Sequence, residues 1–155
     1  MIWENDSVSY KSKNIGPTQT DTSNMGESGN RLLTEKSNNN IKAFNEPKAI
    51  KLDFAYELFK DGIKFIDARP VEEFEVAHIK GAVNIPFYES EKYENALSKI
   101  PMDETIVTYC NGHDCDLSIM LGDELFKKGY KRVYVFYGGW NEWLSKKYPT
   151  ESLSK

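Results

Sequence analysis

The sequence contains little cysteine and no long apolar run. Only 2 of its 155 residues are cysteine, too few for a disulfide scaffold, and both lie in one segment, at Cys110 and Cys115. No apolar run approaches the roughly 18 residues of a membrane-spanning helix. Basic residues are not in excess either, since the net charge is -4. Nucleic acid and anionic membranes both bind proteins through a basic face. We therefore expect no nucleic-acid partner and no membrane span in this chain.

A secretory signal is also lacking. The first residues have neither the basic region nor the apolar region that such a signal needs. On this basis we expect a cytoplasmic protein. A periplasmic or membrane-tethered protein whose anchor lies upstream is the alternative, and an oxidising compartment would favour a disulfide between the two cysteines.

The composition divides the chain into three parts. Residues 1–46 are rich in Ser, Thr, Asn, Gly and Lys and show no apolar periodicity, which predicts a disordered N-terminal arm or linker. Such an arm is either a spacer without function or a tether. Residues 47–150 carry most of the apolar side chains and are predicted to form the folded domain, followed by a flexible C-terminal tail at 151–155.

Strand-like and helix-like segments alternate within residues 47–150. Strands are predicted at 49–50, as an edge strand, and at 63–67, 82–85, 105–109 and 132–136. Helices are predicted from Asp53, as N-cap, to Gly62, after Pro70, over 93–100, over 119–126 and after Gly138-Gly139. This alternation indicates an α/β fold with a central parallel sheet of about five strands and helices on both faces.

Two predicted strands are followed by residues of chemical interest. Asp67 and Arg69 stand at the end of the strand at 63–67, and Cys110 directly follows the strand at 105–109. In open α/β sheets, functional sites form at the carboxyl ends of the strands. We therefore expect these residues to meet at one edge of the sheet.

The segment from Cys110 to Ser118 has the pattern of a short polar loop that runs into a helix. Its amides and the dipole of that helix predict a concave anion site, in which Gly112 permits the curvature and Asp116 or Ser118 caps the helix. A thiol in such a site is expected to have a lowered pKa and to act as a nucleophilic thiolate. The alternative is a buried, inert cysteine that packs as a small apolar residue.

Three segments resemble the rhodanese superfamily of sulfurtransferases, in the order and spacing of that family. They are residues 65–86, which begin Phe-Ile-Asp-Ala-Arg-Pro, residues 106–112, Ile-Val-Thr-Tyr-Cys-Asn-Gly, and residues 129–140, which end Gly-Gly-Trp. The resemblance implies a three-layer rhodanese-like fold over about residues 47–150. It implies no metal and no organic cofactor.

The resemblance also implies roles for individual residues. Cys110 would accept a sulfur atom and carry it as a persulfide, while Asp67 and Arg69 would organise the loop from the neighbouring strand. Preorganised backbone donors stabilise a persulfide anion without rearrangement. The loop residues that would cradle the sulfur are Asn111, Gly112, His113, Asp114, Cys115 and Asp116.

The loop departs from the family by carrying no Arg or Lys. Many members that use thiosulfate bind its sulfonate end with such a residue, whereas Asp114 and Asp116 would repel a dianion. A persulfide or polysulfide donor is therefore favoured over thiosulfate. Related phosphatases require Arg after five intervening residues beyond the cysteine, and Asp116 holds that position here, which argues against phosphate chemistry.

Cys115 and His113 each have two interpretations. Cys115 is either a thiol that resolves an oxidised Cys110 by forming a disulfide, or a small residue that packs at the start of the helix. His113 either protonates a leaving thiolate or is a solvent-exposed loop residue. A zinc site is rejected, because four ligands within so short a segment would strain a tetrahedral geometry.

The sequence thus predicts a sulfurtransferase that moves a sulfane sulfur from a small donor to a thiol or cyanide acceptor through Cys110. The acceptor thiol could belong to a protein. Two alternatives stay open at this point: a catalytically silent rhodanese-like binding or regulatory module, and a redox protein that uses Cys110 and Cys115 as a dithiol.

Overall fold

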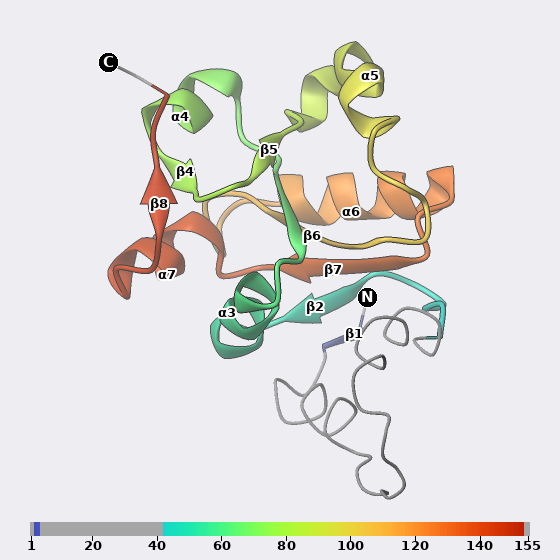
Figure 1. Ribbon diagram of the computed structural model, residues 1–155, viewed down its shortest axis with the longest axis horizontal. Coiled ribbons are helices and arrows are strands. Elements are labelled where there is room, and N and C mark those ends of the chain that lie inside the picture. Colours follow the sequence, from blue (N-terminus) through green and yellow to red (C-terminus); the bar gives the residue numbers. More distant parts are fainter. Residues whose placement is uncertain (1, 4–41, 154–155) are drawn as a thin grey trace, which may run out of the picture.

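A computed structural model describes residues 2–3 and 42–153. The strands in chain order are β1 (Ile2–Trp3), β2 (Lys48–Ile50), β3 (Lys64–Asp67), β4 (His78–Ile79), β5 (Val83–Asn84), β6 (Thr105–Tyr109), β7 (Arg132–Phe136) and β8 (Thr150–Glu151). The helices are α3 (Leu52–Lys60), α4 (Val71–Val76), the 3-10 segment η2 (Phe87–Tyr93), α5 (Glu94–Leu97), α6 (Leu117–Lys128) and α7 (Gly139–Ser145), as drawn in Figure 1. In these ranges, no helix combines the length and apolar character needed to cross a membrane.

The main sheet is parallel throughout, in the order β1-β2-β7-β6-β3-β5. This confirms the predicted α/β class with its central parallel sheet, to which β1 adds an outer strand. The prediction that residues 49–50 form an edge strand is wrong, because β2 lies between β1 and β7. A strand from the predicted arm, which the local pattern did not indicate, takes the edge position.

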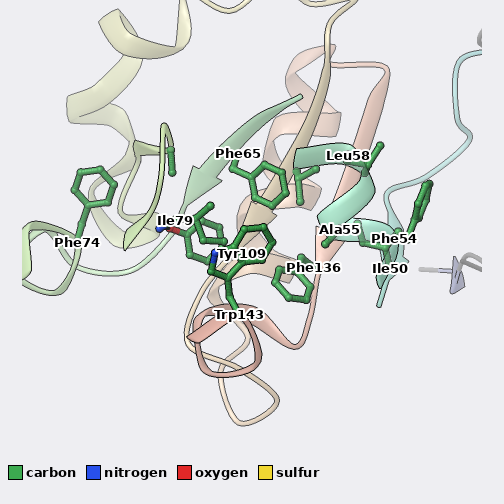
Figure 2. Close-up of a cluster of buried hydrophobic side chains, with 12 residues drawn as sticks. Ile50, Phe54, Ala55, Leu58, Phe65, Phe74, Ile79, Tyr109, Phe136 and Trp143 are labelled. Atoms are coloured by element: carbon green, nitrogen blue, oxygen red, sulfur yellow. The ribbon is translucent and has the colours of Figure 1, made fainter. Parts of the chain in front are cut away.

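Helices cover the sheet on both faces, and each face has its own apolar cluster. On one face, Phe65 and Tyr109 pack with side chains of α3 and α7. On the other face, Ile66 and Ile106 pack with side chains of α6, and Figure 1 shows α3 and α6 on opposite sides of the strands. Figure 2 shows the first cluster, in which the Phe65 ring centroid lies 6.3 Å from that of Tyr109 and 5.8 Å from that of Trp143. The side chains of β3 and β6 therefore alternate between two buried layers.

The strand register aligns the carboxyl ends of four strands. Asp67 of β3 pairs with Tyr109 of β6, which pairs with Phe136 of β7, which pairs with Ile50 of β2. The segments that follow these strands therefore emerge side by side at one edge of the sheet. This is the edge at which the sequence predicts the site.

Two predicted helices differ from those observed. The helix predicted to begin with Asp53 as N-cap has Lys51 in that position, and its hydrogen bonds start with the Ala55 N–H donating to the Lys51 carbonyl at 2.9 Å. Asp53 lies in the first turn instead, where a carboxylate also interacts favourably with the helix dipole. The helix predicted over 93–100 is limited to α5, because η2 precedes it with Glu89 in a non-helical conformation.

The predicted disorder of residues 1–46 falls mainly outside the described residues and stays a prediction. At the described ends of this arm, β1 pairs with β2, and the Phe44 N–H donates to the Lys131 carbonyl at 2.9 Å. The Phe44 ring also contacts that of Tyr134, with 5.1 Å between the centroids. Residues 42–46 therefore approach the domain, although they were assigned to the arm.

The predicted flexible tail at 151–155 begins inside a two-stranded antiparallel sheet, since β8 pairs with β4. The Glu151 carboxylate accepts a hydrogen bond from the Gly81 N–H at 2.8 Å and lies 3.3 Å from the His78 imidazole, and both contacts lower its pKa. The Leu153 N–H donates to the Glu75 carbonyl at 2.9 Å. Residues 154–155 lie outside the described part of the chain.

Candidate active site

Cys110 directly follows β6, and residues 110–116 form the loop that leads into α6. Its side chain is 1% exposed and belongs to the apolar cluster beneath α6, together with Ala68 and Leu121. Because Tyr109 faces the opposite cluster, the strand turns the next residue, Cys110, toward α6. The thiol therefore lies at the predicted edge of the sheet, below the surface.

The backbone of the loop is held by one turn and by the first residues of α7. The Cys115 N–H donates to the Gly112 carbonyl at 2.9 Å, which closes the turn. The Trp140 N–H donates to the Cys110 carbonyl and the Asn141 N–H to the Asn111 carbonyl, both at 2.8 Å. These N–H groups lie at the N-terminus of α7, where a helix has no partners of its own for them. The loop therefore uses donors that helix formation leaves free.

Gly139 permits this contact between α7 and the loop. Its φ is +60°, a conformation that favours glycine, and a Cβ placed on it would collide with the Cys110 carbonyl oxygen. Sequence reasoning assigned the curvature of the loop to Gly112 and missed Gly139. The Gly138-Gly139 pair in the sequence indicates a position that requires glycine. Only the packing of distant segments shows that the Cys110 carbonyl lies against Gly139.

The environment of the Cys110 thiol contradicts the predicted low pKa. Burial is the largest cause that raises the pKa of this thiol, to about 11. The neighbouring Cys115 side chain raises it further, and the S–H group donates to the Cys115 carbonyl with 3.3 Å between Sγ and oxygen. Removing a thiolate from water disfavours it more than the helix terminus stabilises it. At neutral pH the thiol is therefore protonated.

Ser118 opposes this effect at the start of α6. Both its N–H and its hydroxyl lie near Cys110 and lower the pKa of the thiol. The hydroxyl is fully buried and has no hydrogen-bond partner among the residues that the structure describes, although the Ser118 carbonyl accepts from the Thr108 hydroxyl at 2.8 Å. An unsatisfied buried donor beside a sulfur atom is suited to a charge that forms on that sulfur.

Ser118 was predicted only as a helix cap, whereas Asp116 was predicted both as a cap and as part of the loop that cradles the sulfur. Asp116 does hold the N-cap position of α6, but its side chain makes no capping hydrogen bond, and Ser118 lies inside the helix. The buried hydroxyl is instead available to the thiol. The sequence does not separate these two roles, because a serine near the start of a helix fits both.

Replacing Ser118 with alanine should slow alkylation of Cys110 at neutral pH by roughly tenfold, because a hydrogen bond to a charged group is worth about 1.5 to 3 kcal/mol. The melting temperature should change little, since the hydroxyl satisfies no other buried group in the described residues. Alkylation kinetics with peptide mapping would measure the effect. Ser145→Ala, on the exposed side of α7, is the matched control. Equal rates for the two variants would contradict this role of Ser118.

Asp67 and Arg69 form a buried ion pair beside Tyr109. Arg69 donates from Nε to Asp67 at 2.9 Å and from Nη2 to Asp67 at 2.7 Å, and also from Nη2 to the Ala77 carbonyl at 2.9 Å. Its guanidinium carbon lies 4.9 Å from the centroid of the Trp140 ring. Since Trp140 binds the Cys110 carbonyl, the pair supports the helix that holds the loop. The positive charge of Arg69 is therefore neutralised by the Asp67 carboxylate.

The remaining loop side chains face away from this buried sulfur or lie at the rim. The Asn111 side-chain amide donates to Glu73 at 3.0 Å. The His113 imidazole lies 2.9 Å from the Glu142 carboxylate, with both side chains largely exposed, and the Tyr137 hydroxyl donates to the His113 carbonyl at 2.7 Å. These contacts match the interpretation of His113 as an exposed loop residue. Asp114 and Asp116 are exposed as well.

Two cavities border the site. One of about 180 Å³ lies on the Cys110 side of the sheet, where Ala68 and Leu117 line it together with Glu72 and Glu89. The other, of about 260 Å³, extends from His113 toward the start of α3. In the described part of the chain, no group of three or more His, Cys, Asp or Glu side chains is arranged to hold a metal ion.

A family model described as a rhodanese-like domain matches residues 52–146. The chain belongs to the rhodanese-like family. Cys110, its loop, Asp67 and Arg69 all lie inside the matched span. The rhodanese-like match ends before β8 and begins after β2, so that these two strands extend the matched region at its ends.

Relatives of this rhodanese-like chain include proteins named for sulfur chemistry. It is 34% identical over 86 residues to the putative sulfur carrier protein YrkF of Bacillus subtilis, covering 56% of this chain but only 44% of that protein. It is 24% identical over 115 residues to thiosulfate sulfurtransferase 16, chloroplastic, of Arabidopsis thaliana, covering 68% of this chain and 94% of that protein. The solution structure of a polysulfide-sulfur transferase homodimer from Wolinella succinogenes has a TM-score of 0.54 at 22% identity, over 67% of this chain and 77% of that one. The likeness shows a shared rhodanese-like fold.

Proposed function

We propose that this chain is a sulfurtransferase in which Cys110 carries a sulfane sulfur as a persulfide. The Cys110 thiolate attacks the outer sulfur of a persulfide or polysulfide donor, and the electron pair of the broken S–S bond leaves with the rest of the donor. An acceptor thiolate then takes the outer sulfur, and Cys110 leaves as its thiolate. Cyanide would accept the same sulfur as thiocyanate.

One observation carries this proposal: a buried cysteine at a strand end has an unpartnered serine hydroxyl beside its sulfur. Ser118 also contributes its N–H from the first turn of α6, and both groups lower the pKa of the Cys110 thiol. A structural cysteine needs no such donors, because a neutral thiol packs as an apolar side chain. A thiolate or persulfide anion does need them.

The charges around Cys110 favour a persulfide or polysulfide over thiosulfate as donor. Asp114 and Asp116 lie on the loop, and Glu72 and Glu89 line the cavity on the same side of the sheet. The Arg69 guanidinium is paired with Asp67 and 2% exposed, so its charge is not presented to a ligand. Inorganic polysulfide and thiosulfate are both dianions and approach this site against the same four carboxylates. Thiosulfate must in addition release sulfite, a dianion that the loop has no Arg or Lys to hold.

A catalytically silent binding module is the second candidate. The high pKa of Cys110 favours it, because at neutral pH only about one thiol in ten thousand is ionised when the pKa is about 11. The intrinsic nucleophilicity of a thiolate rises with its pKa, which offsets part of this loss.

The test is to incubate the full chain with inorganic polysulfide and, separately, with thiosulfate, and to record intact mass under non-reducing conditions. We expect polysulfide to add sulfur and thiosulfate to add far less, by at least about tenfold. Cys110→Ser should abolish the addition, whereas Ser145→Ala should leave it unchanged. Sulfur uptake that survives Cys110→Ser would overturn the proposal, and no uptake from either donor would establish the silent module.

A further inference from the structure

The loop places a second sulfur beside the first. Cys115 is a free thiol that packs, half-buried, against the same cluster as Cys110. The Cys110 thiol donates to the Cys115 carbonyl at 3.3 Å, so Sγ of Cys110 lies against the backbone of the residue that carries the second thiol. The turn closed between Cys115 and Gly112 holds this arrangement.

The two thiols differ in access to solvent, which suits them to different steps of the reaction. Cys110 is 1% exposed, whereas Cys115 is half-buried and follows the exposed Asp114. Rotation about a Cα–Cβ bond redirects a cysteine sulfur without moving the backbone. A sulfur attached to Cys110 therefore has a partner within the same loop, and an intramolecular thiol reacts at a far higher effective concentration than one in solution.

We infer that Cys115 is a resolving thiol, which releases the sulfur held on Cys110 as hydrosulfide and leaves a Cys110–Cys115 disulfide. This inference rests on the proposed persulfide at Cys110. The Cys115 thiolate, its proton given to solvent, attacks Sγ of Cys110. The bond from Sγ to the outer sulfur breaks, and its electron pair leaves with that sulfur, which takes one proton from solvent and departs as hydrosulfide.

The electrons of this step balance without an external oxidant. The two cysteine sulfurs together lose two electrons, and the sulfane sulfur gains them. A low-molecular-weight thiol or a protein dithiol then reduces the disulfide and restores both cysteines. The site would thus have two outcomes, transfer when an acceptor thiol is bound and reduction to hydrosulfide when none is.

The acidic rim suits release of an anion. Asp114 and Asp116 flank Cys115 in the sequence, and both side chains are exposed. Hydrosulfide that leaves past this rim is repelled by like charge, and the loop offers no Arg or Lys to retain it. A site built only to store sulfur would gain nothing from these carboxylates.

The test follows hydrosulfide and the state of the thiols after a stoichiometric pulse of inorganic polysulfide on the pre-reduced full chain. Cys110→Ser supplies the background. We expect the unmodified chain to release about one additional hydrosulfide per sulfur taken up and to show the Cys110–Cys115 disulfide by non-reducing peptide mapping. Cys115→Ser should keep the added sulfur on Cys110 and release hydrosulfide at least about tenfold more slowly.

A second variant, Cys115→Ala, keeps an apolar side chain in the cluster and separates a chemical role from packing. It should behave as Cys115→Ser does. Two results would overturn the inference while leaving the proposed function intact. One is hydrosulfide release that is as fast in the Cys115 variants as in the unmodified chain. The other is added sulfur that stays on Cys110 as long in the unmodified chain as in those variants. Failure of every chain to take up sulfur would overturn both.

Discussion

Raising the pH from about 7 to about 10 should speed alkylation of Cys110 roughly thousandfold. Burial raises the pKa of this thiol to about 11, and only the thiolate reacts with an alkylating agent. The raised pKa means that the protonated form persists to higher pH than in an exposed thiol. Below the pKa, the thiolate fraction grows about tenfold with each pH unit, so the rate should still be rising where that of an ordinary cysteine has levelled.

Brief pulses of iodoacetamide, followed by peptide mapping, would measure this rate separately for Cys110 and Cys115. Free glutathione at each pH supplies the rate of an exposed thiol. If the alkylation rate of Cys110 levels off at or below the pH at which that of glutathione does, the loop stabilises the thiolate more than burial disfavours it, and the prediction is contradicted. The same profile for Ser118→Ala should be displaced to higher pH, because that variant lacks a donor to the thiolate.

Gly139→Ala should lower the free energy of unfolding by about 3 kcal/mol and impair sulfur uptake together. The new Cβ meets the Cys110 carbonyl oxygen and needs a positive φ, so both strain and overlap act at the junction of α7 with the loop. Relief of the overlap requires the Trp140 N–H to separate from the Cys110 carbonyl. Guanidinium denaturation gives the stability, and intact mass after a polysulfide pulse gives the uptake.

Gly62→Ala is the matched control for this experiment. Gly62 also has a positive φ, +81°, but a Cβ placed there would have nothing within 4 Å. It should therefore cost only about 1 to 2 kcal/mol and leave sulfur uptake unchanged. Equal losses of stability and uptake in both variants would contradict a specific role for Gly139 at the loop.

The sheet and the edge that carries Cys110 could be predicted because both depend on local patterns. β3, β6 and β7 are short apolar runs, and the rule that sites form at strand ends needs only their order. β4 and β8 were missed because each is only two residues long and lies outside any apolar run. Their pairing joins residues far apart in the chain, His78 with Glu151.

The direction of the pKa shift at Cys110 could not be predicted, because it depends on how deeply the loop is buried. A helix terminus and a polar loop are visible in the sequence and favour a thiolate. The apolar cluster that Cys110 shares with Ala68 and Leu121 is not visible there, and burial outweighs the helix terminus. Ser118 and Gly139 were missed for the same reason, since each acts through a contact with a distant or buried atom.

The hydrogen bonds from α7 to the loop have a consequence for synthesis of the chain. Trp140 and Asn141 come late in the sequence, well after Cys110 itself has been made. A nascent chain that has left the ribosome only as far as α6 therefore carries Cys110 without the helix that fixes its loop. During that interval the carbonyls of Cys110 and Asn111 lack their donors, although the cluster beneath α6 can already form around the thiol. Completion of α7 is the event that fixes the loop backbone.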